Sequence, residues 1–280
     1  VWVSLHCSRY EDPGGAAEGL IYQLHDITSR QVAESRLQHI AYHDSLTELP
    51  NRAYFHAQLA KAVEASRIDP SMRFAVMFLD LDRFKVVNDS LGHFYGNELL
   101  REVGRRVQQC LRRNEVVARL GGDEFAVLLH NLYDTHDGLG LAERILQALS
   151  KPLPVGGTEI IPSASVGVTF SDLGYRTVDE MLRDADLAMY EAKAAGRGRV
   201  AVFDRTMHER IADKLALEGD LRRAIGKNEL SLSFQPLFDL EPYRLVGFEA
   251  LARWVHPTRG PVSPAVFISL AEETGHIEAL

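Results

Sequence analysis

The middle of the chain alternates between apolar runs typical of strands and stretches with helical spacing. Residues 74–79 form an unbroken apolar run, as in a strand covered on both faces, and residues 163–170 have alternating apolar positions. Helical spacing is found over 53–67, 84–91, a segment ending near 113, 134–150 and 177–195. Strands separated by helices predict an α/β (α+β) fold, with helices packed against a mixed sheet.

A pair of glycines at positions 121 and 122 is flanked by two short apolar runs. Glycine adopts positive φ angles without steric cost, so the pattern predicts a β-hairpin with a two-residue turn. Asp123 and Glu124 would then lie where the chain leaves the turn, beside backbone that a ligand can approach closely. Taken alone, the hairpin favours the simpler interpretation, a surface turn with solvated acids.

The first 43 residues carry a less complete pattern. Two strands joined by a loop at 11–15 are predicted within residues 1–29, and two strands cannot form a core by themselves. A helix over 30–43 follows, with Thr28 or Ser29 as its cap. Its apolar stripe either contacts a partner helix or packs on its own domain.

The last part of the chain begins a second pattern. A charged helix after residue 204 precedes two strands, near 230–236 and 245–254, and a helix from 264 onward. The chain starts without Met and stops inside this patterned segment. We therefore expect it to be a fragment of a longer protein.

Composition narrows the class of protein. A length of 280 residues suggests one full domain with additional pieces, and 46% hydrophobic with 25% charged residues is typical of a soluble globular protein. The net charge of -8 argues against a nucleic-acid partner or a broad anionic membrane surface. Two cysteines, Cys7 and Cys110, without metal-binding spacing suggest a reducing compartment. With no membrane-length apolar run and no signal peptide, we expect a cytoplasmic protein.

Two acids on separate strands form the best candidate metal pair. Asp80 follows the apolar run at 74–79, at the sheet edge where open α/β folds bind ligands. Buried strands seldom carry a charge without a partner or an ion. Together with Asp123 and the Leu81 carbonyl, Asp80 could hold Mg²⁺, which usually takes one or two carboxylates plus phosphate oxygens. Such a metal lowers the pKa of a ribose hydroxyl, and a nearby carboxylate could take its proton.

Three cations lie where a phosphate would need them. Lys85 comes one turn after Asp80. Lys193 and Arg197 are four residues apart near the end of a helix, which predicts that they share one face. Since the helix dipole favours cations at a C-terminus in any case, phosphate binding and a purely structural role are equal alternatives for this pair.

Several motifs, in this order, resemble those of the GGDEF diguanylate cyclases. They are residues 80–89 (DLDRFKVVND), 92–93, 119–125 (RLGGDEF) and 185–197, and residues 44–52 are similar to that family's N-terminal motif. The match covers about residues 40–204. The resemblance implies a nucleotidyl-cyclase-like central mixed sheet surrounded by helices, with the GGDEF motif on the hairpin. It also implies Mg²⁺ (or Mn²⁺) and condensation of two GTP molecules into cyclic di-GMP with release of two pyrophosphates.

The resemblance assigns roles position by position. Asp80, the Leu81 carbonyl and Asp123 would bind the metal, and Asp123 or Glu124 would assist deprotonation of the attacking 3′-hydroxyl. The remaining implied contacts are Asn88, His93 and Asn97 around the guanosine, and Lys85, Lys193 and Arg197 on the phosphates. Each domain would hold one GTP, so the resemblance implies a homodimer whose two sites face each other, with the stripe on 30–43 as the dimer-forming linker.

Three positions depart from the family pattern. Asn97 stands where Asp is usual, and an amide offers guanine one acceptor where a carboxylate offers two. The inhibitory product site usually reads Arg-x-x-Asp, but here Arg112 is followed by Glu115, so we expect weaker feedback. Glu48 stands where Gly is usual in the family.

Two alternatives to an active diguanylate cyclase stay open. One is a regulatory module that binds GTP or cyclic di-GMP without turnover, and the other is a dimerisation scaffold.

The flanking segments resemble parts of two other families. Residues 1–29 resemble the C-terminal remnant of a PAS sensor domain, and 229–280 resemble the start of an EAL phosphodiesterase, with Glu249 as one metal ligand. Its other ligands would lie beyond the last residue, so we expect no phosphodiesterase activity from this chain. Two linker helices, at 30–43 and 205–228, would then flank a GGDEF domain at 44–204.

Overall fold

The computed structural model describes residues 1–11, 18–227 and 229–280. Contacts divide the chain into two units, Val1–Asp204 and Arg205–Leu280, and each is considered by itself. No helix in the described ranges is long and apolar enough to cross a membrane.

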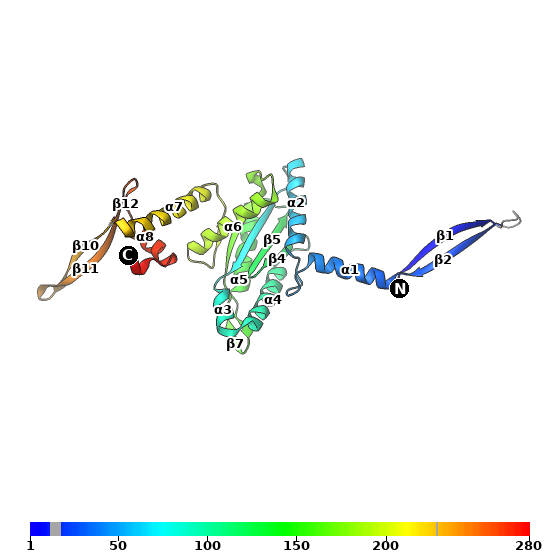
Figure 1. Ribbon diagram of the computed structural model, residues 1–280, viewed down its shortest axis with the longest axis horizontal. Helices are drawn as coiled ribbons and strands as arrows, with labels where there is room; N and C mark the ends of the chain where they lie inside the picture. Colours follow the sequence, from blue (N-terminus) through cyan, green and yellow to red (C-terminus); the bar gives the residue numbers. More distant parts are fainter. Residues whose placement is uncertain (12–17, 228) are drawn as a thin grey trace. The chain divides into compact units, whose positions relative to one another are not determined.

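The first unit is built around a five-stranded sheet of order β4-β5-β3-β8-β9 (Figure 1). The central strand β3 (Phe74–Leu81) pairs antiparallel with β5 (Glu124–His130) and with β8 (Ala164–Phe170). The edges are β4 (Val116–Gly121), antiparallel to β5, and β9 (Val200–Val202), parallel to β8. The predicted mixed sheet is therefore confirmed.

Helices cover both faces of this sheet, which is why β3 reads as an unbroken apolar run. Alternate residues of β3 face opposite layers: Met77 packs with α4 (His93–Cys110) and α5 (Thr135–Leu149), whereas Val76 packs with α2 (Arg52–Ile68) and α6 (Val178–Ala194). Every residue from Phe74 to Leu79 is at most 7% exposed. A short helix, α3 (Phe84–Leu91), and a 3₁₀ turn, Ser171–Leu173, also belong to this unit.

One small hairpin was not predicted from the sequence. Strands β6 (Leu153–Val155) and β7 (Thr158–Ile160) pair antiparallel in the segment between α5 and β8. Gly156 and Gly157, with φ of 60° and 80°, make its two-residue turn. Strands of three residues are too short to show an alternating pattern, so this segment read only as the end of a helix.

At the start of the chain, β1 (Val3–Glu11) pairs with β2 (Glu18–Asp26), and α1 (Thr28–Tyr42) follows. The predicted cap was wrong: Ile27 is the N-cap, and the Thr28 hydroxyl instead accepts the Trp2 N–H at 2.8 Å. The loop predicted at 11–15 lies, from residue 12 onward, outside the described residues.

The apolar stripe of α1 is open to solvent in this unit. Its larger side chains, Val32, Leu37 and Ile40, are 55–68% exposed. Packing of the stripe on its own domain, one of the two interpretations left open by the sequence, is therefore not what the structure shows.

The second unit has its own small core. It contains α7 (Thr206–Lys227), the sheet β10-β11-β12 (Leu230–Leu240, Tyr243–His256, Gly260–Val262), α8 (Pro264–Glu273) and a 3₁₀ turn, Ile277–Ala279. Leu217 and Leu221 of α7 pack with Trp254 and Phe267. Residue 228, the last residue of the linker helix predicted at 205–228, lies outside the described residues.

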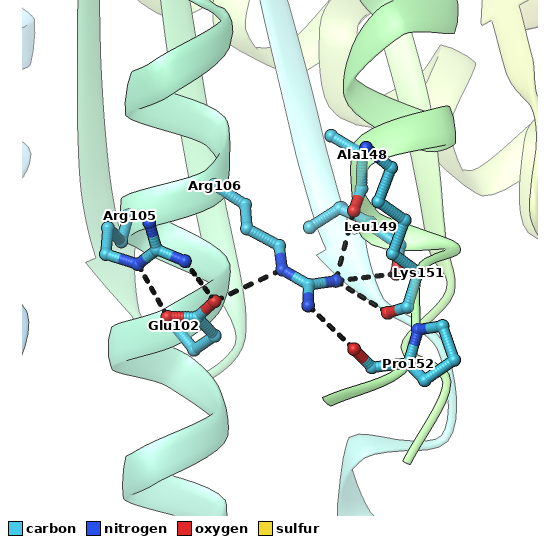
Figure 2. Close-up of polar contacts among 7 residues, drawn as sticks. All are labelled: Glu102, Arg105, Arg106, Ala148, Leu149, Lys151 and Pro152. Carbon is cyan, nitrogen blue, oxygen red and sulfur yellow. Dashed lines mark hydrogen bonds and ion pairs between the residues drawn. The ribbon is translucent and has the colours of Figure 1, made fainter. Parts of the chain in front are cut away.

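One arginine joins α4 to the end of α5. Arg106, whose side chain is 12% exposed, donates from Nη1 to the Ala148 carbonyl (3.1 Å) and the Lys151 carbonyl (2.6 Å), and from Nη2 to the Pro152 carbonyl (2.9 Å), as Figure 2 shows. Its Nε lies 3.2 Å from Glu102 Oε1. The last carbonyls of a helix have no partner within the helix, so Arg106 supplies the missing donors.

We expect Arg106→Ala to lower the free energy of unfolding by about 2 kcal/mol, because the carbonyls at the end of α5 lose several hydrogen bonds from a charged donor. Urea unfolding followed by circular dichroism measures this loss. Arg105→Ala is the matched control: Arg105 is 54% exposed and contacts the same Glu102, so about 0.5 kcal/mol or less is expected. Equal losses for the two variants would contradict the capping role.

Candidate active site

The site begins where β3 meets the end of α6. Lys193 Nζ, in the last turn of α6, lies 2.8 Å from Asp80 Oδ1, and the two side chains are 28% and 13% exposed. The helix lies this close to the sheet because β8 has Gly167 beneath it. A Cβ at Gly167 would lie 2.0 Å from the Ala185 carbonyl oxygen, so only glycine permits the approach that carries Lys193 to Asp80.

The GGDEF hairpin brings two more acids to the same end of the sheet. Glu124 lies directly opposite Asp80 in the β3–β5 register, and the Leu81 N–H points to the Asp123 carbonyl at 3.4 Å. The turn itself differs from the prediction. Gly121 pairs with Glu124, so Gly122 and Asp123 form the turn, and the glycines have φ of 142° and 52°. Asp123 therefore lies in the turn rather than after it.

Burial, together with neighbouring acids, raises the proton affinity of Asp80 and of Glu124. Burial raises the pKa of Asp80, the charge of Asp123 adds to the effect, and the Lys193 ammonium opposes it. Burial likewise raises the pKa of Glu124, and the Arg52 guanidinium, 3.6 Å away, opposes the shift. The site thus holds more negative charge than its own cations neutralise, which favours uptake of a cation.

The raised pKa of Glu124 predicts a pH-dependent effect of Glu124→Gln. A carboxyl group with a raised folded-state pKa costs stability once pH rises through that pKa, and costs nothing below its unfolded value of 4.5. We therefore expect the variant to be more stable than the wild type at pH 7 in metal-free buffer, and equal to it below pH 4.5. Urea midpoints at the two pH values measure this, and a variant less stable at pH 7 would contradict it.

The oxygen donors at this sheet end fit a hard divalent cation. They are the carboxylates of Asp80 and Asp123 and the main-chain carbonyl of Leu81, the residue that follows Asp80. Within the described ranges, no group of three or more His, Cys, Asp or Glu side chains is placed to hold a metal. A donor set with only two carboxylates suits Mg²⁺ or Mn²⁺, which complete their shells with water and phosphate oxygens.

The predicted phosphate cations do not share a helix face. Helix α6 ends at Ala194, and Arg197 lies beyond it in a loop whose φ angles, 113° at Gly196, 63° at Arg197 and 60° at Gly198, are all positive. Positive φ at Gly196 stops the helix, which is the reason for the error. Arg197 lines a pocket of about 400 Å³ with Leu81 and residues of α3, and Lys85 is exposed on α3.

The three predicted guanosine residues lie along α3 and the start of α4, and none of them lines that pocket. Asn88 Oδ1 is buried without a hydrogen-bond partner. It is packed against Gly96, where a Cβ would lie 1.9 Å from it. His93 and Asn97 are exposed in the first turns of α4. The orphan acceptor on Asn88 suits a ligand that donates N–H groups, as guanine does.

The two remaining departures from the family pattern have local explanations. Glu115 accepts the Arg112 N–H at 2.7 Å, so its carboxylate closes its own turn. Glu48 has φ of 59°, in the left-handed region that glycine occupies without strain. The backbone at position 48 therefore keeps the glycine conformation although the side chain has changed.

Sequence reasoning missed a link between the 44–51 loop and the hairpin. Arg119 Nη1 donates to both Asp44 carboxylate oxygens, at 3.0 and 3.1 Å, and Arg119 Nε and Nη2 donate to the Gly122 carbonyl at 3.0 and 2.7 Å. Although burial disfavours ionisation, hydrogen bonds from Thr47 and Arg119 hold the pKa of Asp44 below its usual value. Both residues stand in recognised motifs, but they are 75 positions apart, and nothing in their spacing says that they meet.

Comparisons with known proteins agree with this geometry. The profile "Diguanylate cyclase, GGDEF domain" matches residues 41–199, and the EAL domain profile matches 218–280. The GGDEF domain of TpbB (YfiN) from Pseudomonas aeruginosa is 38% identical, with a TM-score of 0.59 over 61% of this chain and 99% of that one. The coiled coil and GGDEF domain of DgcB from Caulobacter crescentus, in complex with c-di-GMP, is 25% identical, with a TM-score of 0.59 over 63% and 93%.

Curated relatives are of more than one kind. A bifunctional diguanylate cyclase/cyclic di-GMP phosphodiesterase, MucR, and a cyclic di-GMP phosphodiesterase, NbdA, both from Pseudomonas aeruginosa, are each 40% identical over 89% of this chain. The match covers 36% and 31% of those proteins, so the chain spans about a third of their length.

The chain belongs to the GGDEF diguanylate cyclase family, and its C-terminal part is a partial EAL domain. The assignment of residues 1–29 to a PAS-like domain stays a prediction.

Proposed function

We propose that the domain at 44–204 is a diguanylate cyclase that condenses two GTP molecules into cyclic di-GMP and releases two pyrophosphates. The observation that carries this proposal is the grouping of Asp80, Asp123 and Glu124 at one sheet end with Lys193 in contact. Three acids and a cation around a glycine turn suit a site for a metal-bound triphosphate. This function needs GTP, and so places the domain in the cytoplasm.

The acids have different proposed roles, metal binding and proton uptake. Asp80, Asp123 and the Leu81 carbonyl would hold Mg²⁺ or Mn²⁺, which when bound neutralises phosphate charge and favours the ionised ribose hydroxyl. Glu124 has a raised pKa, so it takes up a proton more readily than an ordinary carboxylate does, as a general base for the 3′-hydroxyl must. Asp123 is the alternative acceptor, but the metal would occupy its oxygens.

The remaining side chains bind the substrate. Lys85, Lys193 and Arg197 would balance the charge of the triphosphate. Asn88 would offer its unpartnered Oδ1 to a guanine N–H, with His93 and Asn97 beside it on α4. Because Asn97 supplies one acceptor where the family usually supplies two, we expect weaker discrimination of guanine from adenine than a carboxylate gives.

Two copies must meet for the reaction, because each site would hold one GTP. The exposed stripe of α1 offers a surface for this, since Val32, Leu37 and Ile40 leave an apolar strip on a helix. One solved relative, DgcB, comprises a coiled coil together with its GGDEF domain. The proposal is therefore a homodimer joined in part through α1.

The test is incubation of the protein with GTP and Mg²⁺, with pyrophosphate and cyclic di-GMP measured and the dimer checked by light scattering. We expect both products, in a ratio of two pyrophosphates to one cyclic dinucleotide. No product from a sample shown to be dimeric would end this proposal.

A second candidate is a regulatory module that binds GTP or cyclic di-GMP and controls an attached phosphodiesterase. The partial EAL domain at 218–280 and the name of the relative NbdA favour it, as does the departure at Asn97. GTP binding by calorimetry without turnover would support this candidate, and absence of any nucleotide binding would exclude it.

A further inference from the structure

Beyond the roles above, we propose that Asp82 is a positioning residue for the triphosphate: its carboxylate anchors the loop Gly196–Gly198 to the end of β3 and so sets the place of Arg197. The inference rests on the proposed function, because it concerns the phosphate part of the same site.

The carboxylate of Asp82 has donors from two distant segments of the chain. Its Oδ2 accepts the Ser163 hydroxyl at 2.6 Å and the Gly198 N–H at 3.0 Å, and its Oδ1 accepts the Ser165 hydroxyl at 2.7 Å. The Asp82 N–H donates in turn to the Ser163 carbonyl at 2.9 Å. Hydrogen bonds to an ionised carboxylate are stronger than those between neutral groups. Asp82 therefore links the end of β3 firmly to the start of β8 and to the Gly196–Gly198 loop.

The loop that Asp82 holds needs such an anchor. Three consecutive residues, Gly196, Arg197 and Gly198, have positive φ, and for Arg197 this conformation costs free energy that other contacts must offset. The Arg197 N–H donates to the Ala192 carbonyl at 3.1 Å, which ties one side of the loop to α6. The bond from the Gly198 N–H to Asp82 ties the other side to the sheet.

The position of Asp82 links this anchor to the reaction. Asp82 follows Leu81 directly and lines the same pocket as Leu81 and Arg197. Loss of its carboxylate would free Arg197, whereas Lys193 would keep its place because α6 and Asp80 hold it. The expected consequence is a defect confined to binding of the phosphates.

The test is a cycle of three variants: Asp82→Asn, Arg197→Ala and the double variant. Asp82→Asn makes the group neutral, and its amide nitrogen cannot accept a hydrogen bond. The charge-assisted bonds from Ser163, Ser165 and Gly198 are therefore weakened, and at least one of the three is lost or reversed in direction. We expect KM for GTP to rise about tenfold with little change in kcat, as for a contact made equally in the ground and transition states. The double variant should match Arg197→Ala, because both changes act through one side chain.

Two further variants keep the test clear of folding defects. Ser163→Ala removes one donor to Asp82 and should raise KM in the same sense but less. Asp69→Asn is the matched control, because Asp69 also accepts a serine hydroxyl (2.7 Å) and a main-chain N–H (2.9 Å) but lies before the opposite end of β3. It should leave KM unchanged. Effects of Asp82→Asn and Arg197→Ala that multiply, or a fall in kcat alone, would overturn the inference.

Calorimetry separates this inference from the proposed function. If the wild type binds GTP without turnover, the cycle is measured on binding, with weaker GTP but unchanged guanosine affinity expected for Asp82→Asn. If the wild type turns over GTP but the effects of the two single variants are independent, the role of Asp82 is rejected and the proposed function stands. A wild type that binds no GTP removes both.

Discussion

Replacement of Asp123 by alanine is expected to abolish formation of cyclic di-GMP while leaving the fold intact. Asp123 lies in the turn of the GGDEF hairpin and supplies one of the two carboxylates of the proposed metal site. Removing a ligand that contributes several kcal/mol to transition-state charge balance should lower kcat/KM by about a thousandfold or more. Initial rates of pyrophosphate release over a range of GTP concentrations, at fixed Mg²⁺, measure the loss.

Stability distinguishes this role from a structural one. The charge of Asp123 raises the pKa of Asp80, which means that the two carboxylates repel each other in the metal-free protein. Asp123→Ala should therefore have a urea midpoint equal to or above that of the wild type. Glu159→Gln, a change at an exposed acid on β7, serves as the control with full activity. Lost activity together with a lowered midpoint would indicate that Asp123 maintains the turn instead.

Replacement of Arg119 by alanine should have the largest effect on stability. Arg119 and Asp44 are 11% and 21% exposed, and the guanidinium meets both carboxylate oxygens as well as the Gly122 carbonyl. Without Arg119, a largely buried carboxylate is left without its ion-pair partner, which costs about 3 kcal/mol. Urea unfolding measures this change, and activity should fall as well, because the turn that carries Asp123 loses its support.

A double-mutant cycle isolates the ion pair from other effects of the change. Asp44→Ala, Arg119→Ala and the double variant should give a coupling free energy of about 1–3 kcal/mol. Arg113→Ala, a change at an exposed arginine before β4, is the control and should shift stability by about 0.5 kcal/mol or less. Additive effects in the cycle would show that the pair contributes nothing beyond its separate side chains.

Most helices and strands of the fold could be predicted from the pattern of apolar and polar residues within each segment. The apolar run of β3, the helical spacing of α2, α5 and α6, and the Gly-Gly turn each depend on a few neighbouring residues, so these elements were predicted with errors of one or two positions. The N-cap of α2 is equally local: the Asn51 side chain accepts the Tyr54 N–H, three residues ahead, at 3.1 Å. The acids of the hairpin were found for the same reason, because a contiguous motif carries them.

The order of the elements, the mixed sheet and the identity of the acids and cations follow from local sequence pattern. Which of these side chains meet depends on how the elements pack. Arg119 reaches Asp44, Asp82 reaches Gly198, and Arg197 leaves the helix face that its spacing implied. These contacts join segments far apart in the chain, and packing sets them: α6 comes to Asp80 because Gly167 has no side chain. Local periodicity reports only on residues that are near one another in the chain. The residues of the site could therefore be identified from the sequence, but their contacts could not.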